Sequence, residues 1–143
     1  TMFMNGILGG LVGITAGADQ MSPTDAIIIG TIAGIIIVLG VSFIDKLKLD
    51  DPVGAVAVHL ICGIWGTLAV GIFGAMAGTE QFISQLIGVG VIGTTCIIST
   101  FTILFIVKAI TGNLRVSKEE ELIGLDLSEH GMEAYADFAS KEH

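Results

Sequence analysis

The chain has 143 residues, of which 52% are hydrophobic, with a mean hydropathy of +0.88 and a formal net charge of −8. Only 14% of the residues are charged, against about 25% in an ordinary soluble domain. Eight charged residues lie in residues 1–107 and twelve lie in residues 108–143. This pattern excludes a soluble globular domain and a basic nucleic-acid-binding protein, and it predicts an apolar membrane part followed by a short charged tail.

The first residues, Thr1 to Asn5, contain no basic segment and no small-residue cleavage site, so we do not expect the first apolar run to be a signal peptide. They do not resemble a natural start either, and we expect the sequence to be a piece of a longer chain. Cys62 and Cys96 both lie in apolar runs. Buried free thiols are expected there, and a disulfide between spans is the alternative.

Four long apolar runs predict an all-α, polytopic membrane helix bundle with four crossings of a hydrocarbon core about 30 Å thick. The expected helices span about residues 2–18, 23–44, 52–77 and 82–108, and the first of them is the shortest. Gly9, Gly13 and Gly17 recur every four residues, so they share a helix face on which another helix can approach closely. Gly30 and Gly34 repeat this spacing in the second run.

Two of the runs begin with a helix-start pattern. In Ser22-Pro23-Thr24-Asp25, Ser22 is the expected N-cap, and Asp25 is placed to complete a capping box. Asp51-Pro52 repeats the signal before the third run, with Asp51 as the expected N-cap and Pro52 just inside the helix. Asp50 and Asp51 would then complement the helix dipole, with attraction of cations as the less favoured alternative.

Every Lys and Arg falls on one side of the membrane if the chain crosses four times. Lys46 and Lys48 lie between the second and third runs, and the other four cations follow the fourth run. Because cytoplasmic loops carry the excess of Lys and Arg, the start of the chain and the tail are predicted to be cytoplasmic. The expected division is a membrane part over residues 1–111 and a cytoplasmic tail over residues 112–143.

The tail contains signals for short helices. Ser117 to Glu120 resembles a capping box, and Gly124 is the expected stop of the helix that follows. A second short helix is expected from Glu133 to Ala139. A disordered acidic tail is the alternative, but the tail also carries apolar side chains that could dock on a partner surface.

His59 is the residue that requires an explanation, because an ionisable group inside an apolar span is energetically costly. Small residues surround it on the expected helix, which leaves room for a water molecule or a small solute. In a membrane we therefore favour a histidine that lines a narrow pathway, accepts or donates a hydrogen bond and relays protons. A buried structural histidine bonded to a backbone carbonyl is the alternative.

Other chemistry is weakly supported. His59 and Cys62 are three residues apart and could supply two metal ligands, but no further ligand pair accompanies them, so we predict neither a metal nor a cofactor. No constellation for serine, cysteine or carboxylate catalysis is present in the sequence, so an enzyme is the least favoured class. Thr15 is expected to bond to its own helix backbone.

These residues resemble the ammonium transporter family (Amt/Mep/Rh), and within it the Amt branch. The stretch from Asp50 to His59, with Cys62-Gly63-Ile64-Trp65-Gly66, is similar to the tenth helix of the family. The stretch from Asn5 to Gly17 is similar to the eighth. The tail motifs that match are Leu114-Arg115-Val116, Glu121, Gly124-Leu125-Asp126, His130-Gly131 and Ala134-Tyr135.

The resemblance implies the last four helices and tail of an eleven-helix, inverted-repeat transporter that assembles as a homotrimer in the cell membrane. It implies that ammonia, with or without a relayed proton, crosses a hydrophobic pore past His59, which would be the second of two paired histidines. Leu8 and Ala55 match other pore-lining positions. Gly54 replaces an acid found in some members, so no charged role is carried over to it.

For the tail, the resemblance implies a regulatory platform that couples the subunits, made of Arg115, Glu121, Gly124, Asp126, Ser128, His130, Gly131 and Tyr135. It also implies a PII-type signal protein as a possible partner at the cytoplasmic face. Ser128 matches a phosphorylated threonine of plant relatives, but we favour a helix cap there. The rival functions are a membrane ammonium sensor that signals through the tail, and a membrane scaffold in which His59 is purely structural.

Overall fold

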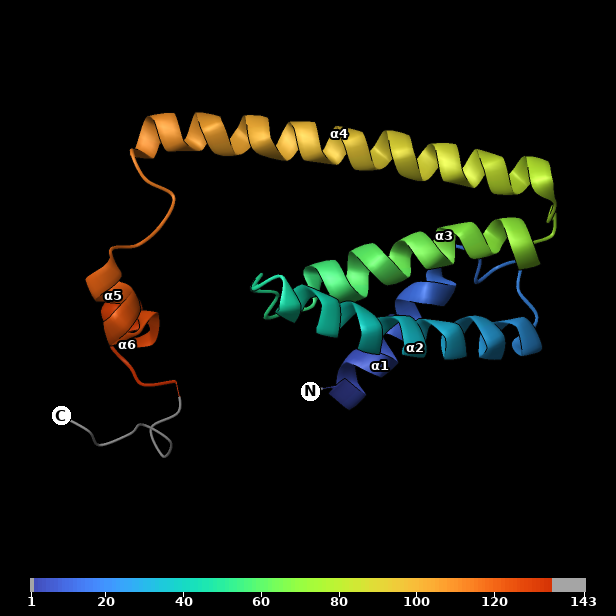
Figure 1. Ribbon diagram of the computed structural model, residues 1–143, viewed down its shortest axis with the longest axis horizontal. Helices are drawn as coiled ribbons and strands as arrows, with labels where there is room; N and C mark the ends of the chain where they lie inside the picture. The colour runs from blue at the N-terminus through green and yellow to red at the C-terminus, as the bar shows by residue number, and fades with distance from the viewer. Residues whose placement is uncertain (1, 135–143) are drawn as a thin grey trace. The chain divides into compact units, whose positions relative to one another are not determined.

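The structure is a computed structural model that describes residues 2–134, and every regular element within that range is helical (Figure 1). The elements are α1 (Met2–Thr15), α2 (Pro23–Lys46), the π-helix η1 (Ala55–Ile61), α3 (Cys62–Phe73), α4 (Thr79–Thr111), α5 (Lys118–Ile123) and α6 (Leu125–His130). Contacts divide the chain into two compact units, one up to Thr95 and one from Cys96 onward.

Three helical stretches are long and apolar enough to cross a membrane, rather than the four that the sequence predicted. They are Pro23–Lys46, Ala55–Phe73 and Thr79–Thr111. The fourth candidate, α1, has 14 residues, so it is about 21 Å long and shorter than a hydrocarbon core. It ends three residues before the predicted boundary, where Gly17 N donates to Ile14 O and a turn begins.

The start of α2 confirms the predicted capping box. Ser22 Oγ accepts a hydrogen bond from Asp25 N at 3.2 Å, and Asp25 Oδ2 accepts one from Ser22 N at 3.1 Å. Pro23 occupies the start of the helix, where a missing N–H group leaves no intrahelical bond unmade. The hydroxyl of Thr15 bonds to Leu11 O at 2.7 Å, as expected for a threonine in an apolar helix.

The small-residue face of α1 packs against α3, as the glycine spacing predicted. A methyl group on Gly9 would contact Cys62 Sγ, and one on Gly17 would contact Val70. Between these points a methyl group on Gly66 would overlap the carbonyl group of Gly13. Residue numbers rise together along both helices, so α1 and α3 run parallel with their backbones in contact.

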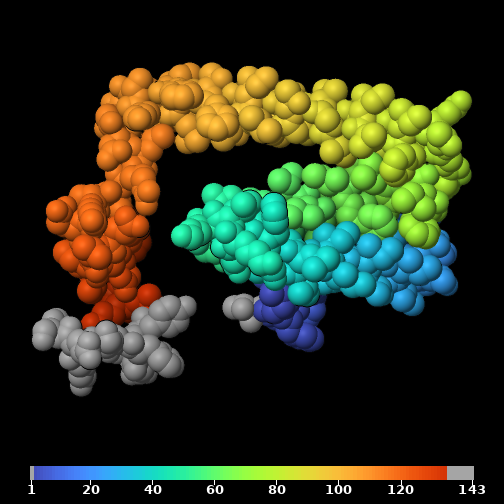
Figure 2. Space-filling model, in the orientation of Figure 1, coloured from blue at the N-terminus to red at the C-terminus, as the bar shows by residue number. Residues whose placement is uncertain are grey.

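The second helix packs against both α1 and α3, and it shares the buried core with the π-helix and α3 (Figures 1 and 2). Ile29, Ala33 and Ile37 are fully buried and lie four residues apart on one face of α2. Trp65 Nε1 on α3 donates a hydrogen bond to Ile29 O at 3.1 Å, which satisfies the indole N–H in this apolar contact. The free thiol of Cys62 lies 3.8 Å from Ala33 O.

The third predicted helix differs from the structure at both ends. It was expected over residues 52–77, but the helical path begins at Ala55 and ends at Phe73. At its end, Gly74 has an extended backbone, and Gln20 Oε1 accepts a hydrogen bond from Ala75 N at 3.3 Å. This bond ties the turn after α1 to the turn after α3.

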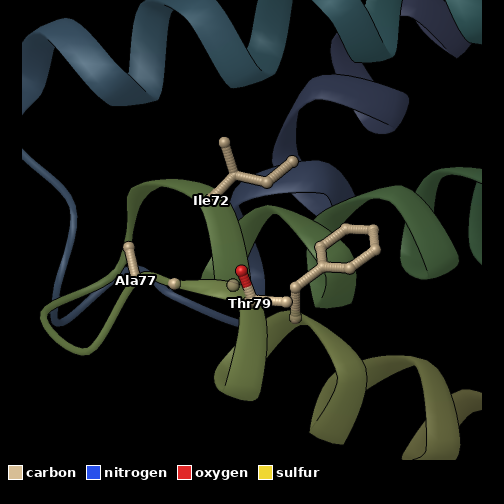
Figure 3. A pocket seen from close by; sticks show the side chains of 6 residues that line it. Ile72, Ala77 and Thr79 are labelled. Carbon is tan, nitrogen blue, oxygen red and sulfur yellow. The ribbon is translucent and has the colours of Figure 1, made fainter.

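The fourth helix is longer than the predicted range of residues 82–108. It begins close to α3, where Phe82 lies against Gly71. An open hollow of about 450 Å³ lies at this turn (Figure 3). It is lined by Gly71, Ile72, Ala77, Gly78, Thr79 and Phe82. Within the described chain, α4 has no buried residue, and its free Cys96 is exposed rather than buried as expected.

The tail forms two short helices. Ser117 and Glu120 form the predicted capping box of α5, and the helix stops at Gly124 as expected. The helix α6 was not predicted, because a six-residue element carries too little periodic signal. Of the helix expected from Glu133 to Ala139, the first two residues are not helical and the others lie outside the described residues.

The contact between α1 and α3 yields a stability prediction. Gly66→Ala places a methyl group on the Gly13 carbonyl and should lower the free energy of unfolding by about 1–3 kcal/mol. Gly30→Ala is the matched control, because no atom lies within 4 Å of the added methyl group and alanine favours a helix. Thermal unfolding of the purified protein should separate the two variants, and equal midpoints would contradict the packing.

Candidate functional site

The candidate site is built around a π-helical turn. The segment Ala55–Ile61 forms hydrogen bonds between residues five apart, whereas the α3 helix that continues from it is α-helical. The change begins at Gly54 O, which accepts from Val58 N at 2.8 Å and also from His59 N at 3.2 Å. Single π turns inside helices occur frequently at functional sites.

The cap of this turn corrects the predicted helix start. Gly54, not Asp51, is the N-cap residue, and Pro52 lies in the preceding turn rather than in the helix. Gly54 has a φ of 70°, a left-handed conformation that glycine adopts without strain. It has no side chain to satisfy the first N–H groups of the helix, so another residue must supply the acceptor.

Asp51 supplies that acceptor from three residues before the N-cap. Its Oδ2 accepts from Ala57 N at 2.9 Å, and both carboxylate oxygens lie 3.2 Å from Val56 N. The predicted capping contact of Asp51 is therefore present, although its position in the chain is different. Asp50 is exposed, and its carboxylate makes no hydrogen bond to any residue between 2 and 134.

The contacts of Asp51 stabilise its charged form. The hydrogen bond from Ala57 N lowers the pKa of this carboxyl group below 3.8, and the bond from Val56 and the nearby His59 contribute in the same direction. The capping interaction is therefore fully present at neutral pH.

His59 is exposed on the surface of the described chain. Its neighbours Ala57 and Val58 are buried, so the imidazole leaves the packed face of the segment. Its backbone N–H is bonded to Gly54 O, and within residues 2–134 its ring makes no hydrogen bond. An exposed imidazole on an apolar helix can meet a solute or a group from outside the described residues.

The other two predicted pathway residues are also exposed. Leu8 on α1 lies next to Gly9, which packs against Cys62 three residues after His59. Ala55 is the first residue of the π-helix, about one turn before His59. Exposure alone does not join the three side chains into one surface, so their shared role in a pathway stays a prediction.

His59 and Cys62 do not form one ligand face. Cys62 is fully buried against Gly9 and Ala33, whereas His59 is exposed. Across residues 2–134, no group of three His, Cys, Asp or Glu side chains is placed to hold a metal ion.

The tail residues named from the sequence lie close together along the chain. Arg115 Nη2 and Glu121 Oε1 form an exposed ion pair at 3.4 Å, and exposed pairs contribute little to stability. Asp126 Oδ2 accepts from Ala134 N at 2.9 Å, which lowers the pKa of Asp126. His130 ends α6, and Gly131 follows it in a left-handed conformation.

The structure corrects the prediction for Ser128 and does not describe Tyr135. Ser128 is not a helix cap: it lies inside α6, whose N-cap is Gly124, because the positive φ of Gly124 allows one helix to follow another directly. Tyr135 lies outside the described residues, so the structure gives no account of it.

Comparison with known proteins places these observations in a family. The model of the Ammonium Transporter Family matches residues 1–135. The Synechocystis protein sll1017, whose name places it provisionally among ammonium transporters, is 50% identical over 128 residues, which cover 90% of this chain and 28% of that protein. Ammonium transporter Amt2 of Archaeoglobus fulgidus is 39% identical, and the match covers 99% of this chain and 34% of the relative. Amt2 of Methanocaldococcus jannaschii is 41% identical, and the match covers 92% of this chain and 32% of the relative.

The Asp51 cap predicts a pH-dependent contribution to stability. The pKa of Asp51 is lower in the folded protein than its ordinary value of 3.8. The carboxylate therefore stabilises the fold fully above pH 3.8, and this stabilisation is lost as the pH falls through the lower pKa of the folded state. Asp51→Asn should therefore destabilise the protein at neutral pH and have progressively less effect below pH 3.8. Unfolding of both proteins across this pH range measures the difference, and a pH-independent difference would contradict the cap.

The tail yields a second prediction. Ser117→Ala removes the capping box of α5 and should destabilise that helix by about 1 kcal/mol, seen as faster amide hydrogen exchange over Lys118–Ile123. Ser128→Ala is the matched control, because the Ser128 hydroxyl makes no hydrogen bond within the described residues. Equal exchange in the two variants would show that the capping box is not formed in solution.

Proposed function

The chain belongs to the ammonium transporter family, and we propose that it contributes one wall of a pathway by which ammonium nitrogen crosses a membrane. It spans about a third of the length of the curated relatives that it matches, so the proposed activity is that of a larger helical assembly. The observation that carries the proposal is the exposed imidazole of His59 within an apolar candidate span.

The chemistry of the solute agrees with this surface. Ammonium is a hydrated cation that an apolar pore opposes, whereas ammonia is small and neutral. The ring of His59 accepts or donates a hydrogen bond to a passing nitrogen and relays a proton by changing its protonation state. Binding there has to be weak, because conduction requires release. Leu8 and Ala55 supply the apolar lining, and Ala55 leaves room beside the imidazole.

The orientation of the pathway is part of the proposal. The chain forms the last four helices of the transporter, with its start and its tail on the cytoplasmic side of the cell membrane. The support is that Lys46 ends α2 and Lys48 follows it, while the remaining cations lie in the last turn of α4 or after it in the sequence. Asp51 then lies at the cytoplasmic mouth, beside the start of the third span.

The assembly is proposed as a homotrimer with one pathway in each subunit. The tail, through the region of Arg115, Glu121 and Asp126, couples the subunits and receives a PII-type signal protein. The support is the compact local structure of this region, in which Asp126 holds the turn after α6 in place.

The test of the pathway is His59→Ala in the full-length transporter. We expect the maximal rate of methylammonium uptake into proteoliposomes to fall by about a hundredfold, or its coupling to proton movement to be lost. Leu60→Ala is the matched control, because it truncates the next exposed side chain on the same segment and should change uptake by less than about twofold.

Unchanged uptake, ion selectivity and proton coupling in His59→Ala would refute the pathway role and favour a structural histidine. Ammonium binding without any flux in the unmodified protein would instead identify a sensor that signals through the tail. The first result requires that the His59→Ala variant assembles as the unmodified protein does, which size-exclusion chromatography in detergent establishes.

A further inference from the structure

The π turn that contains His59 is joined by hydrogen bonds to its cap, which is formed by Asp51 and Gly54. The Gly54 carbonyl group is shared between the N–H groups of Val58 and His59, and the Asp51 carboxylate occupies the N–H groups of Val56 and Ala57. The N–H groups of Val56 and Ala57 are among those that a helix start leaves without partners in the helix. The Gly54 carbonyl group accepts the first bonds of the helix itself, so residue 59 is held directly to the cap by its own N–H group.

Gly54 is fitted to this position in two respects. Its φ of 70° strains any residue with a Cβ atom, and a methyl group there would lie 2.7 Å from Val58 Cγ2. Val58 cannot move aside easily, because it is fully buried in the core with Ala33 and Cys62. A glycine at position 54 thus allows the carbonyl group to face the π turn while Val58 stays packed.

The turn determines on which side of the helix His59 lies. Val58, Cys62 and Gly66 are buried at intervals of four residues, and this stripe is fixed by its contacts with α1 and α2. A π turn contains one more residue than an α turn. If the segment relaxed to an α-helix while Cys62 stayed packed, residues before Cys62 would rotate about the helix axis by tens of degrees. The imidazole would then point in a different direction.

We propose that Asp51 and Gly54 are positioning residues, which hold the π turn and so direct the His59 ring out of the packed core. This inference rests on the proposed pathway role of His59. It differs from ordinary capping, in which a carboxylate only stabilises the helix. It also differs from a purely electrostatic role, in which the charge of Asp51 at the cytoplasmic mouth only attracts cations. The three roles predict different results for the same variants.

The experiment compares Asp51→Ala, Asp51→Asn and Gly54→Ala in the full-length transporter reconstituted in proteoliposomes, with His59→Ala measured in parallel. Asp45→Ala is the control, because it removes an acidic charge from the last turn of α2, six residues before Asp51, and the Asp45 carboxylate has no hydrogen bond within residues 2–134. The readouts are the maximal rate of methylammonium uptake, its half-saturating concentration and the amount of assembled protein.

We expect Asp51→Ala and Gly54→Ala each to lower the maximal rate by about ten- to a hundredfold, because small misplacements of a working group have effects of this size. The half-saturating concentration should change by less than about twofold. Asp51→Asn keeps one acceptor oxygen, so it should retain most of the rate. Asp45→Ala should behave as the unmodified protein. The structure of Asp51→Ala should show an α-helical segment and a rotated His59.

The inference is overturned if Asp51→Asn and Asp51→Ala raise the half-saturating concentration equally, since that result identifies a charge effect. It is also overturned if the rate falls only in proportion to the assembled protein, or if the Asp51→Ala structure keeps the π turn. A normal rate in His59→Ala would refute the proposed function itself. A slow His59→Ala with a fast Asp51→Ala would refute only the positioning role.

Discussion

The contact between the backbones of α1 and α3 is the constraint on which the rest of the first unit depends. Gly66 lies so close to the Gly13 carbonyl group that no side chain fits between them. In lipid, helices gain little from hydrophobic burial against one another, so close backbone packing between small residues is what holds them. This contact fixes α3, and α3 in turn fixes the direction in which the preceding π turn presents its side chains.

The core is built from buried residues of α2, the π-helix and α3, and its polar groups are satisfied locally. Trp65 bonds to the carbonyl of Ile29, and no buried side-chain nitrogen or oxygen in residues 2–134 lacks a partner. The exposed ring of His59 makes no hydrogen bond within the same residues. A polar ring left available beside buried apolar residues is consistent with the proposed site for a small hydrogen-bonding solute.

The start of the third span shows how a helix cap is divided between two residues. Gly54 provides the conformation and the shared carbonyl group, and Asp51 provides the charged acceptor. In an ordinary N-cap, one serine or aspartate performs both tasks. Because Asp51 supplies the acceptor, residue 54 needs no side chain. Val58 occupies the space in which a side chain at position 54 would lie. The family match and the position of His59 are the reasons for proposing that Asp51 and Gly54 position the His59 ring.

The sequence by itself determined the helical class, the capping boxes at Ser22 and Ser117 and the glycine face of α1, because these depend on periodicity and on local hydrogen bonds. Its motifs also determined the family. Only the tertiary structure decided that the third span begins at Ala55 with a π turn, that Asp51 caps it from outside the helix and that Ser128 lies within α6. The Asp-Pro signal was read as an N-cap because that interpretation assumes a regular α-helix. The packing of Val58 and Cys62 against α2 overrides this local preference, since burial fixes which residues must share a face, and the backbone turn adjusts to it.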